Sequence, residues 1–427
     1  MTFLCLDVGS TWTKGVAVSA AGAVLGVAQH RTTPPEVLDG VAAVTGALPA
    51  ASSVLACSSA GGGLRLAVVG QERLVSAEAG YRVALSAGAK VVHVSSGLLD
   101  PAAVRVLRAA APDVVLLVGG TDGGDEKVLL HNASRLARVA VPVVLAGNAA
   151  ARDEALASLS GRRVVPAANV LPDVGELEPG PARVAIREVF LRHVIGGKGL
   201  SRGPRFRRLV RTVTPDAVLS GVSRLAGVLA ERDEQAGAVL VVDVGGATTD
   251  VYSAVSTVES TEHAVALPPD RRTVEGDLGM RVSAPGVVAE AQAARLSFPE
   301  SLVAQARRRH EHVDLVPTTP GESEVDLELA RLAVVLAVRR HLQLVDGNLG
   351  PRGAGVLILS GGVFRHAPDL TTVEADLRKH LGPVLREAEF RVDRDGLLAP
   401  AGLLTQSGHA EIADAVLKSL HETGVHR

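Results

Sequence analysis

Aliphatic runs joined by Gly/Thr turns are the clearest pattern along the chain, and one such unit occurs twice. Segment 4–18, LCLDVGSTWTKGVAV, is an aliphatic run, a turn, and a second run in which apolar and polar positions alternate. Segment 240–254, LVVDVGGATTDVYSA, repeats this order. Alternation with a period of two on both sides of a short turn predicts a β-hairpin. Two related hairpins so far apart predict a duplicated fold with two facing halves.

A second pattern lies between the hairpins. Short aliphatic runs alternate there with stretches of helical character. The predicted strands are 91–94, 114–118, 141–146 and 163–165, and the predicted helices are 101–111, 126–138 and 149–159. Strand–helix alternation at this spacing indicates a parallel sheet made of right-handed crossovers.

These patterns divide the chain into five expected parts. After the second hairpin they predict helices within 287–309, a loop at 316–324, a long helix at 326–345 and a strand at 355–359. The expected parts are a first domain at 1–86, an inserted α/β subdomain at 87–172, connector helices at 173–234, a second domain at 235–398, and a C-terminal connecting segment and helix at 399–427 that returns to the first domain.

Composition and charge narrow the classes of protein that fit. The 427 residues are 47% hydrophobic, 21% charged and 2% aromatic, which suits aliphatic strands covered by helices, as in α/β proteins. The net charge of −2 gives no general attraction to nucleic acid or to an anionic membrane. Two cysteines, Cys5 and Cys57, are too few for a disulfide framework or a zinc or iron–sulfur site. No apolar run is long enough to span a bilayer, and the first residues already enter a strand, so we expect a cytoplasmic protein.

The turn of the first hairpin carries side chains suited to a polyphosphate. Gly9 lets the main chain approach a phosphate closely, and Ser10 and Thr11 can add hydroxyl donors. Lys14 supplies a counter-charge, and Asp7 suits a hydrated Mg²⁺ that bridges the phosphates. Taken alone, an ordinary hairpin with a polar turn explains this motif equally well, because short glycine motifs are common.

The second hairpin repeats these features and strengthens the interpretation. Gly245 and Gly246 allow close approach, Thr248 and Thr249 are candidate donors, and Asp243 is placed to orient a water or to hold the metal. Two such loops on opposed halves would clamp a phosphate chain from both sides.

The charges of the two hairpins differ at one aligned position. The aligned pairs are Asp7 with Asp243, Gly9 with Gly245, Thr13 with Thr249, and Lys14 with Asp250. Thr13 therefore belongs to the predicted ligand-binding set. We expect the first hairpin to hold phosphate and the second to place metal and water, a division that favours hydrolysis as well as binding.

A third element, VLILSGGVFRH at 356–366, is an aliphatic strand that runs into two glycines and a helix start. Gly361 and Gly362 would let a flat base or a ribose lie against the backbone, and Ser360 or Arg365 could hydrogen-bond it. Alone this signal is weak, because a Gly-Gly turn between a strand and a helix is often only a matter of geometry.

In this order the three elements resemble the phosphate-1, phosphate-2 and adenosine motifs of the actin/sugar-kinase/heat-shock superfamily. Helix 214–231 resembles the first connecting segment of that superfamily and 398–408 the second. Glu275 and Gly276, in EGDLGMR, fall where some branches carry a nucleotide-side turn. The resemblance implies an α/β fold of duplicated ribonuclease-H-like (actin-like ATPase) domains around a nucleotide cleft, with an inserted parallel α/β subdomain.

One branch is more similar: the glutamate mutase accessory proteins of the GlmL or MutL type, which are unrelated to mismatch repair. CSSAGGGLRLAVVG (57–70), VVLLVGGTDGG (114–124) and HVIGGKGLS (193–201) are among the segments that carry this resemblance. It implies ATP and Mg²⁺ as cofactors and an adenosylcobalamin-dependent mutase as protein partner. The implied function is an ATPase that reactivates or assembles that mutase.

Two other functions fit the same scaffold. A small-molecule kinase needs a further acidic residue near the acceptor, for which Asp122 and Asp277 are the candidates. An actin-like, nucleotide-gated scaffold is the other alternative.

Further polar clusters allow two interpretations each. The acidic loop 119–126 could hold a metal or contact a partner, or could only favour a helix start. The histidines have no convincing ligand spacing and are interpreted as surface residues. They are His193, His310, His312 and His341. The basic stretch 202–211 is interpreted as a solvated face.

Overall fold

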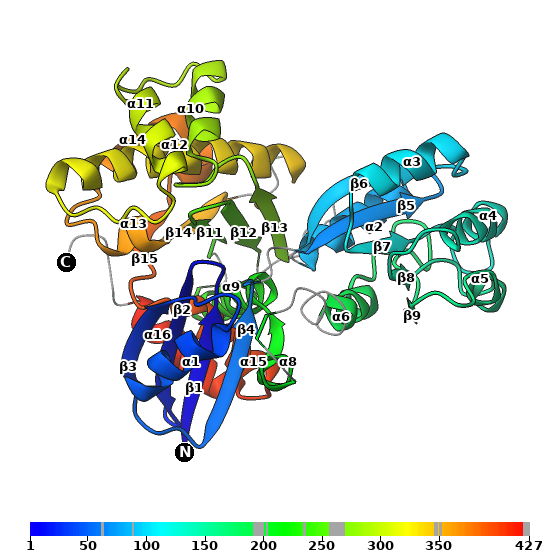
Figure 1. Cartoon of the computed structure of the whole chain (residues 1–427), viewed down its shortest axis with the longest axis horizontal. Helices are drawn as coiled ribbons and strands as arrows, with labels where there is room; N and C mark the ends of the chain where they lie inside the picture. The colour runs from blue at the N-terminus through cyan, green and yellow to red at the C-terminus, as the bar shows by residue number, and fades with distance from the viewer. Residues whose placement is uncertain are drawn as a thin grey trace.

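Three five-stranded sheets form the frame of the molecule (Figure 1). The computed structural model describes residues 1–60, 64–87, 89–190, 200–201, 204–233, 236–255, 270–345, 349 and 352–421. The segment 193–201, which carries part of the family resemblance, lies almost wholly outside the described residues, as do His193 and residues 61–63.

The first sheet has the strand order β10-β4-β1-β2-β3. Its strands are β1 (Thr2–Val8), β2 (Trp12–Ser19), β3 (Val24–Arg31), β4 (Ser53–Ser58) and β10 (Val210–Val213). The meander β1-β2-β3 is antiparallel, whereas β4 runs parallel to both β1 and β10. Helix α1 (Val37–Gly46) connects β3 to β4.

The second sheet repeats this plan strand by strand. It consists of β11 (Ala238–Val244), β12 (Thr249–Ala254), β13 (Asp270–Glu275), β14 (Ala354–Ser360) and β15 (Glu389–Val392), in the order β13-β12-β11-β14-β15. Again the first three strands form an antiparallel meander and the other two are parallel additions. The shared order and sense of pairing confirm the duplicated fold that the two hairpins predict.

The third sheet is wholly parallel and is inserted between β4 and β10. Its strands are β5 (Arg65–Gly70), β6 (Lys90–Ser96), β7 (Val114–Leu117), β8 (Val143–Leu145) and β9 (Val164–Pro166), and its order is β6-β5-β7-β8-β9. The connecting helices are α2 (Ser76–Ser86), α3 (Pro101–Ala109), α4 (Lys127–Leu136) and α5 (Arg152–Ser158). This unit stands beside the two halves in Figure 1.

The domain boundaries that follow from the three sheets differ from those expected from the sequence pattern. The expected boundary at residue 87 leaves β5 and α2 in the first domain, yet β5 is a strand of the inserted sheet and α2 packs against it. Strand β10 lies within the expected connector of 173–234, yet it is the fifth strand of the first sheet. A buried aliphatic run pairs with whichever edge its neighbours offer, so its sheet cannot be assigned from the run itself.

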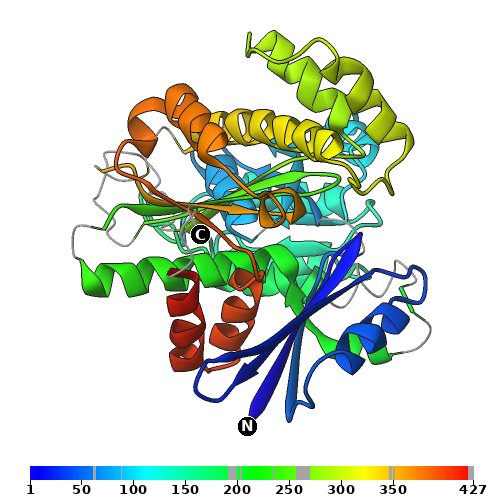
Figure 2. The same ribbon diagram turned by 90° about the vertical axis from the view of Figure 1, so that its left-hand side faces the viewer.

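A long helix lies between the two duplicated halves. Helix α9 (Thr214–Arg232) contacts strands of both sheets, and α15 (Leu398–Gln406) and α16 (Ala410–His421) pack against it (Figure 2). Gly221 of α9 and Gly402 of α15 meet at the crossing, where a Cβ on Gly221 would lie 2.2 Å from the carbonyl oxygen of Leu398. Because only glycine fits there, the two helices approach backbone to backbone.

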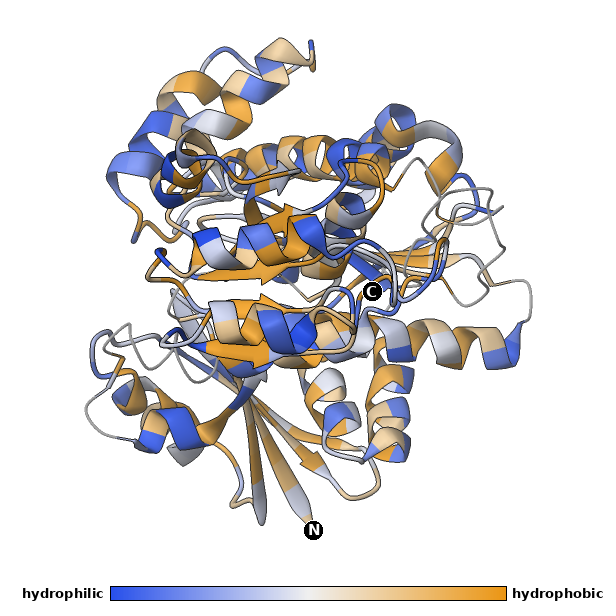
Figure 3. Cartoon of the chain, turned by 90° about the vertical axis from the view of Figure 1, so that its right-hand side faces the viewer, coloured by the Kyte–Doolittle hydropathy of each residue, from blue (hydrophilic) through white to orange (hydrophobic). Residues whose placement is uncertain are grey.

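Helices α10 (Ala284–Ala293), α11 (Leu302–Glu311), α12 (Pro320–Leu344) and α14 (Thr371–Leu381) accompany the second sheet, together with the short α13 (Gly362–Arg365) and the 3₁₀ turn η2 (Gly382–Leu385). Two more helices, α6 (Gly180–Val189) and α8 (Arg205–Leu209), lie between the inserted sheet and β10 in the chain. Apolar residues concentrate in the strands and on one side of the helices (Figure 3). No helix in the described part of the chain is long and apolar enough to cross a membrane.

Helix α12 begins earlier than the predicted loop at 316–324 allows. Its cap is Thr319, whose Oγ1 accepts a hydrogen bond from the backbone N–H of Glu322 at 3.3 Å. Pro320 occupies the first turn, where a missing N–H costs nothing. The Pro and Gly that suggest a loop are therefore part of a helix start.

His341 of α12 is a core residue, and its interpretation as a surface histidine is wrong. It is fully buried, and its ring nitrogens hydrogen-bond Thr273 Oγ1 at 3.0 Å and Ser253 Oγ at 2.9 Å. Burial lowers the pKa of His341 to about 3, with a smaller contribution from Arg271. His310 and His312 are exposed, as expected.

Candidate functional site

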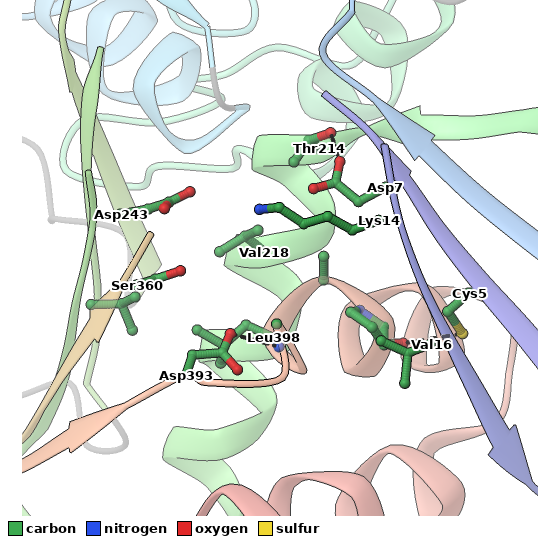
Figure 4. A pocket seen from close by; sticks show the side chains of 14 residues that line it. Cys5, Asp7, Lys14, Val16, Thr214, Val218, Asp243, Ser360, Asp393 and Leu398 are labelled. Atoms are coloured by element: carbon green, nitrogen blue, oxygen red, sulfur yellow. Dashed lines mark hydrogen bonds between the residues drawn. The ribbon is translucent and has the colours of Figure 1, made fainter. Parts of the chain in front are cut away.

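A cleft with about 490 Å³ of open space separates the two duplicated halves. Four of the residues predicted from the sequence meet there (Figure 4): Asp7 and Lys14 from the first half, and Asp243 and Ser360 from the second. The remaining lining residues are Cys5, Val16, Thr214, Val218, Val241, Asp393, Gly396, Leu398, Ala399 and Pro400. Side chains more than 230 positions apart in sequence thus face one space.

The two hairpin turns have the same backbone geometry. The N–H of Gly9 donates to the carbonyl of Trp12 at 3.0 Å, and the N–H of Gly245 donates to the carbonyl of Thr248 at 2.9 Å. A Cβ would lie 2.7 Å from the Trp12 oxygen and 3.0 Å from the Thr248 oxygen, so both turns require glycine. Ser10 and Thr11 are exposed beyond the first of these glycines, in the turn.

Asp7 is held from several sides. Its Oδ1 accepts a hydrogen bond from Thr214 Oγ1 at 2.5 Å and a weak one from Cys57 Sγ at 3.7 Å. Burial raises the pKa of this carboxyl; Lys14 and Thr214 oppose the rise, and the negative charge of Asp243 adds to it. Lys14 faces Asp7 across the β1–β2 ladder, and its ammonium extends toward Asp243 in Figure 4. The ammonium therefore lies between two carboxylates of opposite halves.

The turn of Gly361 and Gly362, after β14, lies beside the second hairpin. Ser360 pairs with Asp243 in the parallel register of β11 and β14. Gly361 has a φ of 118°, and a Cβ there would lie 2.4 Å from the carbonyl oxygen of Val244. Gly362 is exposed at the start of α13. The glycine at 361 thus lets this turn pack directly on β11.

Asp250, the counterpart of Lys14, is not a free carboxylate. Arg272 of β13 donates to it through Nε at 2.9 Å, and only 4% of the Arg272 side chain is exposed. Burial raises the pKa of Asp250, and Arg272 opposes the rise. Asp250 does not line the cleft, so Asp243 is the acidic residue that the second hairpin presents there. The difference in charge that the two hairpins present to the cleft is therefore smaller than the sequence predicts.

The other predicted threonines are hydrogen-bonded within the protein. Thr13 and Thr249 are fully buried; Thr13 Oγ1 hydrogen-bonds Thr32 Oγ1 at 3.1 Å, and Thr249 Oγ1 donates to the carbonyl of Leu278 at 2.5 Å. Thr248 Oγ1 donates to Asp250 at 3.3 Å. These contacts tie the three hydroxyls into the hairpins.

The carbonyl of Gly246 accepts hydrogen bonds from the N–H groups of Arg281, at 2.7 Å, and of Val282. The turn of the second hairpin is therefore tied to the segment that precedes α10. This contact fixes the position of the turn at the cleft.

Glu275 and Gly276 are not brought to the cleft. Glu275 accepts a hydrogen bond from Arg340 at 2.8 Å, and a Cβ on Gly276 would lie 2.2 Å from Nζ of Lys90 in the inserted sheet. Glu275 is the last residue of β13, which is an edge strand, and Gly276 follows it. The turn that they form is a contact between the second half and the inserted sheet.

Thr214 and Asp393 line the cleft, although the sequence analysis does not select them. Thr214 opens α9, and Asp393 follows β15 and accepts hydrogen bonds from the N–H groups of Leu397, at 2.7 Å, and Leu398. Burial raises the pKa of Asp393, and these backbone N–H groups oppose the rise. The sequence carries only a weak signal for Asp393: it directly follows the short strand EFRV, whereas Asp7 and Asp243 lie near the ends of aliphatic strands.

The acidic loop after β7 is closed by its own hydrogen bonds. Asp122 Oδ1 accepts from the N–H of Ala149 at 2.8 Å and from Asn169 Nδ2 at 2.9 Å, and Asp125 accepts from Gln71 Nε2 at 3.2 Å. These contacts organise the turns at one end of the inserted sheet.

The cleft fits a metal that arrives with a phosphate chain. In the part of the chain that the structure describes, no group of three or more His, Cys, Asp or Glu side chains is arranged to hold a metal ion. Mg²⁺ generally keeps several waters and takes one or two carboxylates together with phosphate oxygens. Asp7 and Asp243, on opposed halves, are suitable donors of that kind.

Comparison with known proteins gives a clear match in sequence. The family model described as "MutL protein" matches residues 3–420. "Protein MutL" from Clostridium tetanomorphum is 33% identical over 449 aligned positions, which cover 95% of this chain and 96% of that protein.

Solved structures are more distant. A nucleotide-free acetone carboxylase is 14% identical with a TM-score of 0.39 and covers 94% of this chain and 69% of that one. Xylulose kinase from Rhodospirillum rubrum is 14% identical with a TM-score of 0.35 and covers 97% and 92%. At this level of similarity the fold follows from the duplicated strand order, and the family follows from the sequence. The chain belongs to the MutL family of glutamate mutase accessory proteins.

Proposed function

We propose that this protein is an ATPase that reactivates or assembles an adenosylcobalamin-dependent mutase, using Mg²⁺-bound ATP. The observation that carries the proposal is the cleft itself, in which Asp7 and Lys14 face Asp243 across the two halves. Membership of a mutase accessory family supports the choice of partner. ATP binding that closes the cleft and hydrolysis that opens it would transmit motion to that partner.

The residues of the cleft suit phosphate chemistry. Lys14 would stabilise charge on the transferring phosphoryl group, and the N–H groups around Gly9 and Gly245 would bind phosphate oxygens. Asp7 and Asp243 would hold Mg²⁺, which would neutralise phosphate charge when bound. Asp243 would also orient the attacking water. Ser360 and the glycines after it would support the nucleoside.

The kinase alternative receives less support from the cleft. Its two candidate acids lie elsewhere: Asp122 accepts hydrogen bonds within the inserted sheet, and Asp277 pairs with Arg340 at 2.8 Å. Neither lines the cleft. Asp393 does, but it is buried and already accepts two backbone hydrogen bonds.

ATP consumption by the purified protein tests the proposal. It is measured alone and with a cobalamin mutase that carries an inactivated cofactor. We expect slow hydrolysis that the mutase stimulates, together with recovery of mutase activity. The protein would instead be a kinase if the mutase does not change the rate of ATP hydrolysis and a small hydroxylated or carboxylated metabolite becomes phosphorylated.

A further inference from the structure

A second pocket lies on the first half, away from the cleft. It has about 770 Å³ of open space and is lined by Leu55 of β4, Arg187 of α6, Arg211 of β10, and Leu403, Gln406 and Ser407 at the end of α15. We call it the arginine pocket. It shares no lining residue with the cleft.

Both arginines have guanidinium N–H groups that are available for further hydrogen bonds. Nε of Arg187 is buried without a hydrogen-bond partner, which is costly unless a ligand or water completes it. Arg211 is exposed, and it has no side-chain partner among the residues that the structure describes. It lies at an irregularity of the β10–β4 ladder, where Val210 and Thr212 pair with the adjacent residues Ala56 and Cys57. A β-bulge of this kind redirects a side chain, here to the edge of the pocket.

The carboxylate beside Arg187 is already engaged. Asp216 of α9 forms an ion pair with Arg187 and accepts hydrogen bonds from Thr212 Oγ1 at 2.9 Å and Gln406 Nε2 at 3.2 Å. Arg183 lies 3.8 Å from the same carboxylate and forms a shorter ion pair with Asp270, at 3.2 Å. Arg183, Arg187 and Arg211 therefore exceed the carboxylates of Asp216 and Asp270 by one positive charge.

We infer that the arginine pocket binds a small organic oxyanion, a carboxylate or a phosphate. Planar guanidinium groups match both anions through paired N–H donors. Ser407 lies at the rim as a further polar group, and Leu55 and Leu403 offer apolar walls for the rest of the molecule.

The pocket is connected to the cleft through the first turn of α9. Thr214 donates to Asp7 in the cleft, and two residues later Asp216 holds Arg187 and Gln406 at the arginine pocket. A ligand that engages Arg187 would change the position of this turn and hence the contact to Asp7. This second step depends on the proposed nucleotide site, and linkage requires the effect to be reciprocal.

Titration of the full-length protein with sodium phosphate and with sodium succinate, at constant ionic strength, tests the pocket. Binding is followed by phosphorus line width for phosphate and by saturation-transfer NMR for succinate. We expect at least one anion to bind saturably, with at least tenfold weaker binding in Arg211→Gln and unchanged binding in Arg208→Gln, a matched change on neighbouring α8. The Lys14→Gln variant distinguishes the two sites. It should retain anion binding at the arginine pocket, whereas binding of phosphate in the cleft would be weakened by loss of Lys14.

Absence of saturable binding, or equal binding by Arg211→Gln and wild type, would overturn the site. The linkage is tested by repeating the titration with Mg²⁺ and ATP present, where we expect at least a threefold change in anion affinity. If nucleotide binds and the anion affinity stays constant, the linkage is wrong although the site stands. If nucleotide does not bind at all, the proposed function fails while the anion site is still measured in its own right.

Discussion

At the scale of single residues, Asp243 is the side chain on which the proposed ATP hydrolysis depends most directly. Replacing it by Asn keeps its shape but removes the charge that would hold Mg²⁺ and orient water. We expect Asp243→Asn to lower ATP turnover by about 10²–10³-fold, the range seen when one group that stabilises a transition state is removed. Nucleotide affinity should fall far less, because Lys14 and the glycine turns remain.

Steady-state hydrolysis and equilibrium binding of a fluorescent nucleotide measure the two effects separately. Asp153→Asn, an exposed change on α5, is the matched control. Wild-type turnover in Asp243→Asn would refute the assigned role.

Thr214 should set the pH range in which Asp7 is ionised. Burial raises the pKa of Asp7, and the hydrogen bond from Thr214 opposes this rise. In Thr214→Val the pKa of Asp7 rises further, so the carboxylate is protonated at higher pH. We therefore expect the acid limb of the ATPase pH profile to shift to higher pH, and Thr214→Ser to restore it. An unshifted limb in Thr214→Val would mean that Asp7 does not control it.

His341 should make the protein less stable in acid. Its pKa is about 3 in the folded protein and 6.5 in the unfolded chain, so between these values the unfolded state binds the extra proton. The contribution of His341 to stability is present above pH 6.5 and is lost as the pH falls toward 3, by at most about 1.4 kcal/mol per pH unit. Urea unfolding of His341→Gln at several pH values should show a weaker pH dependence than wild type, whereas His366→Gln, an exposed control, should not.

At the scale of elements, the crossing of α9 and α15 gives the sharpest structural test. A Cβ on Gly402 would lie 1.8 Å from the carbonyl oxygen of Ala217, and the neighbour is backbone that cannot rotate away. We expect Gly402→Ala and Gly221→Ala each to destabilise the protein by about 1–3 kcal/mol or more, as overpacking does. Gly227→Ala lies on the same α9 with nothing within 4 Å and should stabilise it by up to about 1 kcal/mol. Denaturant unfolding distinguishes them, and equal effects at 221 and 227 would refute the close crossing.

The elements also show which features a sequence can predict. The twin hairpins and the aliphatic strands are predictable because alternation and turn residues are local signals. Strand β10 is only four residues long, between an Arg-rich helix and α9, so nothing local identifies it as a sheet edge. The burial of His341 depends on Ser253 and Thr273 of a different element. The order Thr-Pro-Gly-Glu at 319–322 is typical of a helix start, but Pro and Gly are also typical of loops, so the sequence predicts a loop there.

The residues of the candidate site likewise include some that the sequence predicts and some that it does not. Asp7, Lys14, Asp243 and Ser360 lie on motifs and meet in the cleft as a group. Thr214 and Asp393 join them only because α9 begins, and β15 ends, at the cleft. The threonines at 13 and 249 share the motif, yet strand alternation turns them into the interior.

At the scale of the whole molecule, hydrogen bonds across the cleft join the two halves at β3. Arg365 of α13 donates to Gln29 Oε1 at 3.3 Å, and Arg31 donates to the carbonyl of Asp314 at 3.0 Å. Arg31 also lies over the ring of Trp12, 5.5 Å from its centroid. These contacts would break if the halves rotate apart, so they are expected to favour the closed cleft.

Gln29→Ala should therefore speed nucleotide release. The lost hydrogen bond is worth about 0.5–1.5 kcal/mol, which corresponds to a roughly two- to tenfold faster dissociation of ADP if the bond exists only in the closed state. Stopped-flow displacement of a fluorescent nucleotide measures this rate. Gln343→Ala, an exposed glutamine change on α12, should leave it unaltered, and thermal unfolding of both variants should match wild type because neither position is in a core. If Gln29→Ala releases ADP at the wild-type rate, the hydrogen bond between Arg365 and Gln29 does not hold the cleft closed.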